Sequence, residues 1–166
     1  MNPEVLIACV GNIFLGDDAF GVEVAQRLRS VSLPEGASVV DFGIRSYDLA
    51  YALMKPWELV VLVDAISRGG EPGTIYVIEP DLTAVEQDSN DTGFDAHTMN
   101  PASVLQMVKA LGGKCSRMLV VGCEPSTVEP RSDGQFELSE PVRAGVEEAV
   151  RTVLELVAGT GRATAA

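Results

Sequence analysis

The chain has 166 residues, of which 46% are hydrophobic and 22% are charged, and this usage is typical of one globular domain. Its 24 acidic and 12 basic residues give a formal net charge of −12, which argues against nucleic acids and anionic membrane surfaces as partners, because their phosphates would be repelled. The N-terminal residues lack the basic stretch of a secretion signal, and no apolar run approaches the roughly 20 residues that span a bilayer. We therefore predict a cytoplasmic protein without a membrane segment.

Short apolar runs bounded by turn residues predict five β-strands. They are Val5–Val10, Ser38–Phe42, Leu59–Val63, Thr74–Ile78 and Met118–Gly122. The continuous apolar character of the third run is typical of a strand that is buried on both faces. The turn-rich connection Gly69–Gly73 is too short for a crossover helix, so the fourth strand is expected to run antiparallel to its neighbour.

Apolar residues with helical spacing lie between and after these runs. The predicted helices are Phe20–Leu28, Leu49–Leu53, Pro101–Leu111 and Pro141–Val157. Strands that alternate with helices predict an α/β fold, here a three-layer sandwich in which a twisted, five-stranded, mixed but mostly parallel sheet lies between helices. We expect a single domain over residues 1–158 and a frayed C-terminal tail over residues 159–166.

The three cysteines, Cys9, Cys115 and Cys123, are odd in number and far apart in the sequence. They include no C-x-x-C pair, so neither a disulfide framework nor a zinc framework is indicated. Cys9 and Cys123 lie within predicted strands and are expected to be buried, reduced thiols.

Acidic residues follow the first three predicted strands, at the edge of an α/β sheet where ligands usually bind. Asp17 and Asp18 lie in the loop after the first strand, Asp41 lies at the second, and Asp64 directly follows the third. The only histidine, His97, precedes a predicted helix and could reach the same edge. The fold is therefore expected to bring carboxylates and one imidazole together.

Several familiar chemistries are not supported by the motifs of the chain. The glycines Gly11, Gly16 and Gly21 form neither a dinucleotide-binding motif nor a P-loop, and no G-x-S-x-G elbow is present. Asp18, Asp64 and His97 can instead form a set of three metal ligands that leaves coordination positions open. Such oxygen and nitrogen donors accept nickel, zinc, manganese or cadmium, so the residue types leave the metal open.

Each of these residues also has a structural interpretation. Asp17 is expected to be the N-cap of a helix that begins at Asp18 or Ala19, and Asp18 alone would be a solvated carboxylate of the first turn. His97 alone would be a hydrogen-bonded loop or core histidine. Asp64 is harder to explain in this way, because a carboxylate directly after five apolar residues lies near the core and needs a partner.

Four segments of the chain resemble the hydrogenase maturation endopeptidases, which process the large subunit of [NiFe] hydrogenases. They are "GNIFLGDDAFG" near the N-terminus, "DFG" at the second strand, "VVLVDAI" at the third strand and "DAHTMNP" around the histidine. The resemblance implies an α/β sandwich and places the nickel ligands of the family on Asp18, Asp64 and His97. Two departures are visible, since Asp18 stands where many members have glutamate and Phe42–Ser46 replaces a glycine-rich run.

The activity that the resemblance implies is removal of a C-terminal peptide from the [NiFe] hydrogenase large-subunit precursor after nickel insertion, with the nickel of the precursor used for recognition. Zinc or cadmium could substitute for nickel in a crystal. Asp17 and Asp41 are candidate helpers, for example as general base, and Arg45 could meet a carboxylate of the substrate. We expect a monomer. The alternatives are a nickel-binding chaperone that does not cut, and a small hydrolase or nucleotide-binding domain.

Overall fold

The computed structural model describes residues 4–80, 106, 108–113, 116–128 and 137–164. Within these ranges a sheet contains five strands in the order β2-β1-β3-β5-β4. They are β1 (Val5–Val10), β2 (Ala37–Gly43), β3 (Leu59–Ala65), β4 (Ile75–Ile78) and β5 (Met118–Cys123). The first, second, third and fifth strands pair in parallel, and β4 pairs antiparallel with β5. The mixed, mostly parallel sheet is as predicted.

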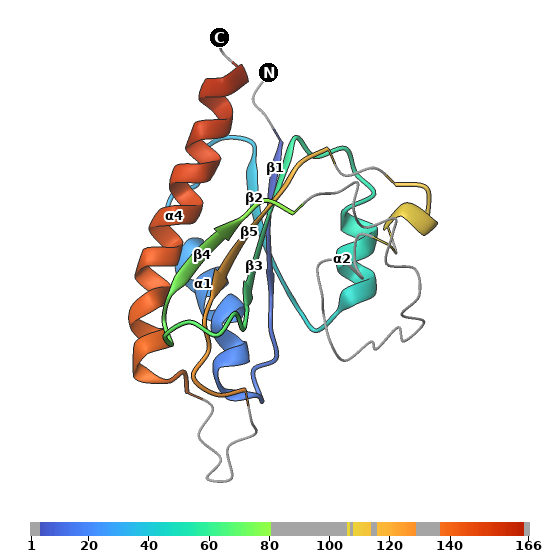
Figure 1. The fold of residues 1–166 in the computed structure, drawn as a ribbon. Coiled ribbons are helices and arrows are strands. Elements are labelled where there is room, and N and C mark those ends of the chain that lie inside the picture. The colour runs from blue at the N-terminus through green and yellow to red at the C-terminus, as the bar shows by residue number, and fades with distance from the viewer. Residues whose placement is uncertain (1–3, 81–105, 107, 114–115, 129–136, 165–166) are drawn as a thin grey trace.

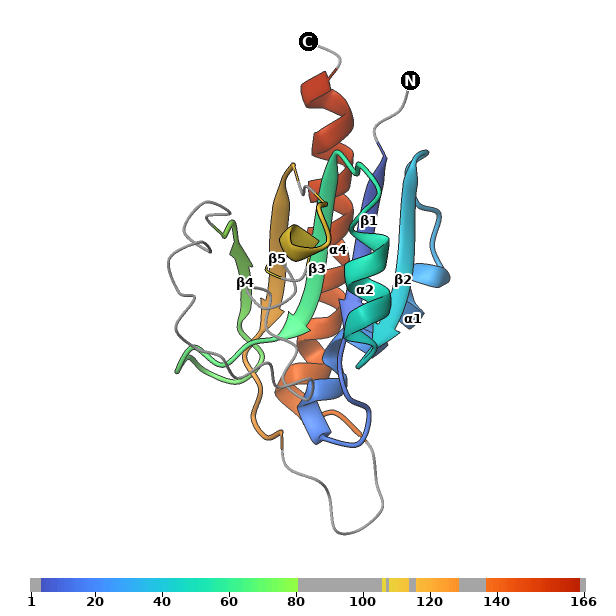
Figure 2. The ribbon, with the colours of Figure 1, turned by 90° about the vertical axis from the view of Figure 1, so that its right-hand side faces the viewer.

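Helices cover both faces of this sheet (Figures 1 and 2). On one face lie α1 (Phe20–Arg29) and the long α4 (Glu140–Thr164), and on the other lies α2 (Ser46–Ala52). The strands alternate their side chains between two hydrophobic clusters, one of which packs against α1 and α4 and the other against α2. This explains why β1 and β5 are buried over their whole length. The predicted α/β architecture is confirmed.

The C-terminal helix differs from the prediction. We expected it to end at Val157 and to be followed by a frayed tail from residue 159, but α4 continues to Thr164. Gly159 weakens a helix without ending it, and no proline stops the chain. The Thr160 hydroxyl donates a hydrogen bond to the Leu156 carbonyl (3.0 Å), and Val157 is anchored in the core. Of the predicted helix Pro101–Leu111, residues 106 and 108–110 are helical and Leu111 lies in a turn, whereas residues 101–105 and 107 lie outside the described residues.

Two of the three thiols are buried as predicted. Cys9 and Cys123 are free cysteines, and burial raises the pKa of each thiol to about 12. Cys115 lies outside the described residues. Over the described part of the chain, no helix has both the length and the apolar character needed to cross a membrane.

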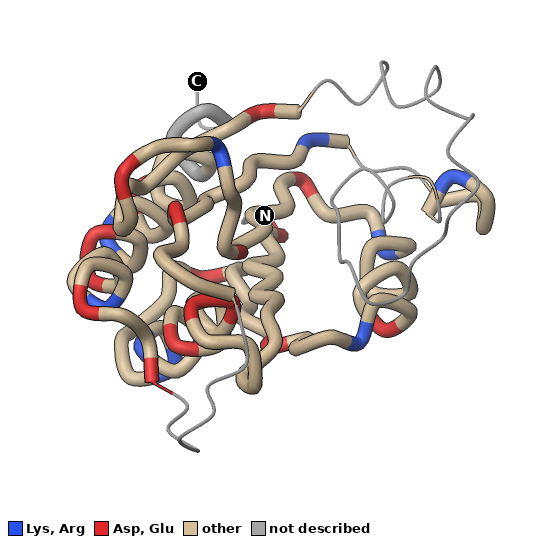
Figure 3. Tube along the Cα trace, turned by 60° about the horizontal axis from the view of Figure 1, so that its bottom comes forward, with Lys and Arg blue, Asp and Glu red and all other residues tan. Residues whose placement is uncertain are grey.

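The connections between the strands define one edge of the sheet. The chain passes from β1 to β2 through α1 on one face and from β2 to β3 through α2 on the other, and β3 returns to the opposite side of β1. The boundary between β1 and β3 is therefore a topological switch point, where α/β proteins bind ligands beyond the carboxyl ends of the strands. Figure 3 turns this edge toward the viewer and shows that acidic positions outnumber basic ones.

Candidate metal centre and active site

Two glycines bring the start of the first helical segment onto the ends of β1 and β3. A short 3-10 helix, η1 (Gly16–Ala19), leads directly into α1. A Cβ atom added to Gly21 would overlap the Val10 carbonyl oxygen and would lie 2.8 Å from the Val63 carbonyl oxygen. A Cβ atom added to Gly11 would overlap the Asp18 carbonyl oxygen. The missing side chains allow η1, with Asp18, to lie against the switch point.

Gly21→Ala is expected to destabilise the protein by roughly 1–3 kcal/mol, because the added methyl group must push α1 away from two strand ends. Thermal unfolding measures this effect, with Gly159→Ala as the control. A Cβ atom at Gly159 meets nothing within 4 Å, and alanine there favours the helix by roughly 0.5–1 kcal/mol. Equal unfolding temperatures for the two variants would contradict the close approach at Gly21.

Asp18 and Asp64 form the electrostatic centre of this edge. Asp18 is partly buried, and its Oδ2 accepts a hydrogen bond from the Asn12 N–H (3.0 Å). Asp64 lies within the last residues of β3 with 8% of its surface exposed, and its Oδ1 accepts the Ala65 N–H (2.8 Å). Burial raises the pKa of Asp18, and burial together with the charge of Asp18 raises the pKa of Asp64 well above its usual range.

The two carboxylates therefore repel each other in a partly desolvated place. Within the described ranges no lysine or arginine forms an ion pair with either of them. A cation bound between them would remove the repulsion and would favour the charged form of both groups, so the donor set fits a divalent metal ion. The described residues hold no group of three histidine, cysteine or acidic side chains suited to a metal. The third predicted ligand, His97, lies outside the described residues.

Asp17 differs from the prediction that it caps the helix. The N-cap position of η1 is Leu15, and no side chain caps it. Asp17 is instead fully buried, and its carboxylate accepts four hydrogen bonds from distant residues. They come from the Ser126 N–H (2.8 Å), the Thr127 N–H (3.1 Å), the Ser139 N–H (2.7 Å) and the Ser139 hydroxyl (2.8 Å). Asp17 thus joins η1 to the segments that follow β5 and precede α4.

Asp41 and Arg45 lie on the other side of β1 from Asp64. Asp41 is on β2, and its Oδ1 accepts the N–H of Gly43 (2.9 Å). The Arg45 guanidinium donates to the carbonyl oxygens of Asp41 (2.6 Å) and Phe42 (3.1 Å) and lies 3.4 Å from the Asp48 carboxylate. All three guanidinium nitrogens therefore have acceptors, at the end of β2 and in the first turn of α2. This arrangement favours a structural role of Arg45 over binding a substrate carboxylate.

Glu124 was missed in the sequence analysis. It directly follows β5 and has 5% of its surface exposed. Its carboxylate accepts the N–H groups of Arg68 (2.7 Å) and Gly69 (3.2 Å) and the Tyr76 hydroxyl (2.9 Å), and the Arg68 N–H makes the largest contribution to lowering its pKa. Glu124 thus fixes the segment that follows β3 and Asp64. The signal was an acidic residue directly after an apolar run, the same signal that identified Asp64.

Comparisons with known proteins agree on one family. Residues 22–156 match the sequence model of the family described as hydrogenase maturation protease. A protein of Methanocaldococcus jannaschii assigned to the hydrogenase maturation proteases is 34% identical over 92% of this chain and 96% of its own length.

Solved structures give the same result. The hydrogenase maturating endopeptidase HybD from Escherichia coli is 25% identical, with a TM-score of 0.75 over 95% of this chain and 94% of that one. The [NiFe] hydrogenase maturation protease HycI from Thermococcus kodakarensis is 27% identical, with a TM-score of 0.65 over 94% and 93%.

Proposed function

The chain belongs to the hydrogenase maturation protease family, and from this premise we propose that it removes the C-terminal peptide of a [NiFe] hydrogenase large-subunit precursor after nickel insertion. It is an endopeptidase that processes the [NiFe] hydrogenase large subunit. The proposal adds where the cut falls and when it is made. The observation that carries it is the pair Asp18 and Asp64, two carboxylates with raised pKa values and no cationic partner among the described residues.

In this proposal the nickel ion arrives as part of the substrate. Asp18, Asp64 and His97 would complete the coordination of an ion that the precursor already holds, so that only a loaded precursor binds productively. A divalent ion held there would supply Lewis acidity, which can polarise a peptide carbonyl or lower the pKa of a bound water. Gly11 and Gly21 allow Asp18 to lie close to the ends of β1 and β3, β3 itself carries Asp64, and Glu124 holds the segment after Asp64. Asp41 remains a candidate general base.

A reducing compartment is consistent with this reaction. Cys9 and Cys123 are free thiols, and extracytoplasmic proteins more often pair their cysteines. We therefore place the reaction in the cytoplasm.

The proposal is tested by incubating the purified protein with nickel-loaded and nickel-free precursor and measuring intact masses. We expect a C-terminal fragment to be lost from the loaded precursor only. Cleavage of both forms would overturn the dependence on nickel. An unchanged mass of a loaded precursor that binds would favour the nickel-binding chaperone, because the same ligands serve both functions.

Metal binding by the enzyme is expected to weaken as the pH falls. The ligands must be deprotonated to bind, and the raised pKa of Asp64 means that protons compete at a higher pH than for an ordinary aspartate. Titration calorimetry with nickel ions at intervals between about pH 8 and pH 5 measures the change. Asp64→Asn serves as the control and should bind weakly at every pH. An affinity for the parent protein that stays constant over this range would contradict the ligand assignment.

A further inference from the structure

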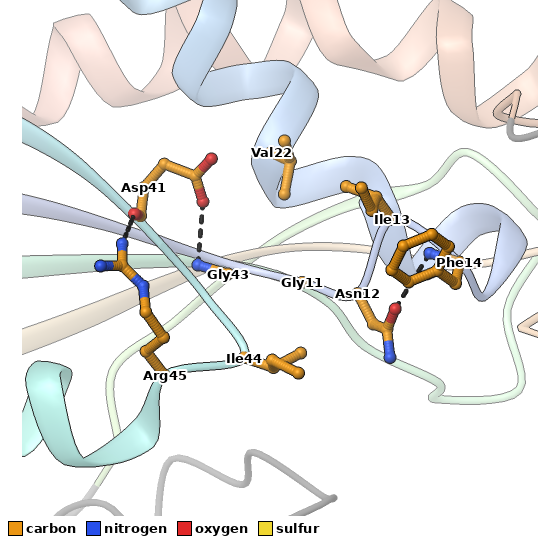
Figure 4. Close-up of a pocket in the computed structure, with 9 residues that line it drawn as sticks. All are labelled: Gly11, Asn12, Ile13, Phe14, Val22, Asp41, Gly43, Ile44 and Arg45. Atoms are coloured by element: carbon orange, nitrogen blue, oxygen red, sulfur yellow. Dashed lines mark hydrogen bonds between the residues drawn. The ribbon is translucent and has the colours of Figure 1, made fainter.

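A surface hollow of about 260 Å³ lies next to the candidate metal centre, since its lining residue Asn12 donates a hydrogen bond to Asp18. Figure 4 shows the residues that line it. We call it the apolar hollow. It is lined by Gly11, Asn12, Ile13, Phe14, Val22, Asp41, Gly43, Ile44 and Arg45. Two separate segments build it, the loop after β1 and the end of β2 with the turn that follows, and Val22 of α1 adds to the lining. Its volume is below the roughly 300–1,000 Å³ of pockets that enclose drug-sized ligands, so it suits one or two amino-acid side chains.

Hydrogen bonds hold the two walls of the apolar hollow in place. The Gly11 N–H donates to the Gly43 carbonyl (3.0 Å), which joins one wall to the other. The Asn12 Oδ1 accepts the Phe14 N–H (2.9 Å), and the Arg45 guanidinium holds the Asp41 carbonyl. The hollow is therefore formed before any ligand binds, and a ligand does not have to order its walls.

The exposed side chains of the hollow are mainly apolar. Ile13 is 47% exposed and Ile44 is 61% exposed, although burying these apolar side chains would lower the free energy. Figure 4 shows Arg45 and Asp41 at one end of the hollow, where the guanidinium donates hydrogen bonds to carbonyl oxygens at the end of β2. Adjoining exposed apolar side chains in a preformed depression are typical of a binding surface. The chemistry suits an apolar side chain rather than an anion.

The hollow adjoins the candidate metal centre at the loop after β1. Asn12 lines the hollow, and its N–H donates to Asp18 Oδ2. An extended peptide advances by roughly 3.3–3.6 Å per residue. A substrate chain with its scissile bond at Asp18 and Asp64 therefore reaches the hollow within a few residues.

We propose that the apolar hollow is a substrate subsite that receives an apolar side chain of the precursor close to the scissile bond. This inference rests on the proposed function, because it takes the precursor as the ligand. Ile13 and Ile44 would then set the affinity for the precursor without taking part in bond cleavage. They are specificity residues, distinct from the carboxylates Asp18 and Asp64.

The test compares Ile44→Ser and Ile13→Ser with the control Val31→Ser. Val31 is 41% exposed and follows α1, at the opposite edge of the sheet. Two quantities are measured for the nickel-loaded precursor, its equilibrium binding to each immobilised protein and the kinetics of its cleavage. We expect Kd and KM to rise about tenfold in both hollow variants, which corresponds to roughly 1.4 kcal/mol, while kcat stays within about twofold. Val31→Ser should behave as the parent protein.

The two readouts separate this proposal from the proposed function. Parental Kd and KM in both hollow variants would overturn the subsite, even though the parent protein cleaves. A fall in kcat at unchanged KM would also overturn it, because the residues would then act in the chemical step. If the parent protein binds the precursor but does not cut it, weaker binding by the hollow variants still supports the subsite. A parent protein that does not bind the loaded precursor overturns both proposals.

Discussion

Asp64→Asn is expected to abolish cleavage of the precursor and, at the same time, to raise the melting temperature of the metal-free protein. The amide keeps an oxygen that can accept the Ala65 N–H but carries no charge to bind a cation. The raised pKa of Asp64 means that its charged form is disfavoured in the folded state. Removing the charge should therefore stabilise the fold at neutral pH, by roughly 2–4 °C for each 1 kcal/mol gained.

The dependence on pH has a definite sign. The folded state binds the Asp64 proton more tightly than the unfolded chain, whose pKa is near 3.8. Raising the pH from 3.8 through the raised folded pKa therefore lowers the stability of the parent protein, and this loss is absent in Asp64→Asn. Thermal unfolding with a chelator present, at acidic and neutral pH, measures the difference. Asp48→Asn, an exposed carboxylate on α2, is the control. Full activity, or a lower melting temperature at neutral pH, would contradict this account of Asp64.

Asp17→Ala is expected to lower the free energy of unfolding by roughly 2–4 kcal/mol. The change removes the acceptor of four hydrogen bonds and leaves the donors of Ser126, Thr127 and Ser139 to find other partners in a partly buried place. An N-cap, by comparison, is worth about 1 kcal/mol. Denaturant unfolding measures the loss, and Asp48→Ala is the matched control, since its carboxylate is exposed.

A structural role of Asp17 also predicts how activity behaves. Well below its unfolding temperature, Asp17→Ala should retain nickel binding and a measurable rate of cleavage. If Asp17 were instead the general base, cleavage would be lost while the stability stayed unchanged. That result would contradict the structural role and support a catalytic one.

The sequence predicted those features that depend on local patterns. Alternating strands and helices predicted the mixed sheet, and the short connection Gly69–Gly73 predicted the antiparallel β4. The position of Asp64 directly after an apolar run predicted a carboxylate near the core, and Asp64 is buried in the structure. These inferences work because burial and strand direction follow from nearby residues.

The errors concern partners that are distant in the sequence. The residues next to Asp17 favoured a helix cap, but the groups that donate hydrogen bonds to its carboxylate lie more than a hundred residues further along the chain. The Glu124 carboxylate accepts hydrogen bonds from the backbone of residues 68–69, and the residues around Glu124 in the sequence do not indicate these distant partners. The helical pattern of apolar residues stops at Val157 and Gly159 weakens it further, so the extension of α4 to Thr164 was not predicted. The placement of His97 beside Asp18 and Asp64 stays a prediction.

The hydrogen bonds of Asp17 also bear on the order in which parts of this protein fold during its synthesis. Its carboxylate pairs with residues 109, 110 and 122 positions further along the chain. Contacts of such separation form late in folding, because a long loop must close first. During synthesis the N-terminal residues emerge first, so Asp18 and Asp64 are made well before Ser139 can hold η1 in place. We expect a nascent chain shorter than about 140 residues to lack the finished site, so that a protease able to cut another protein is assembled only after Ser139 has left the ribosome.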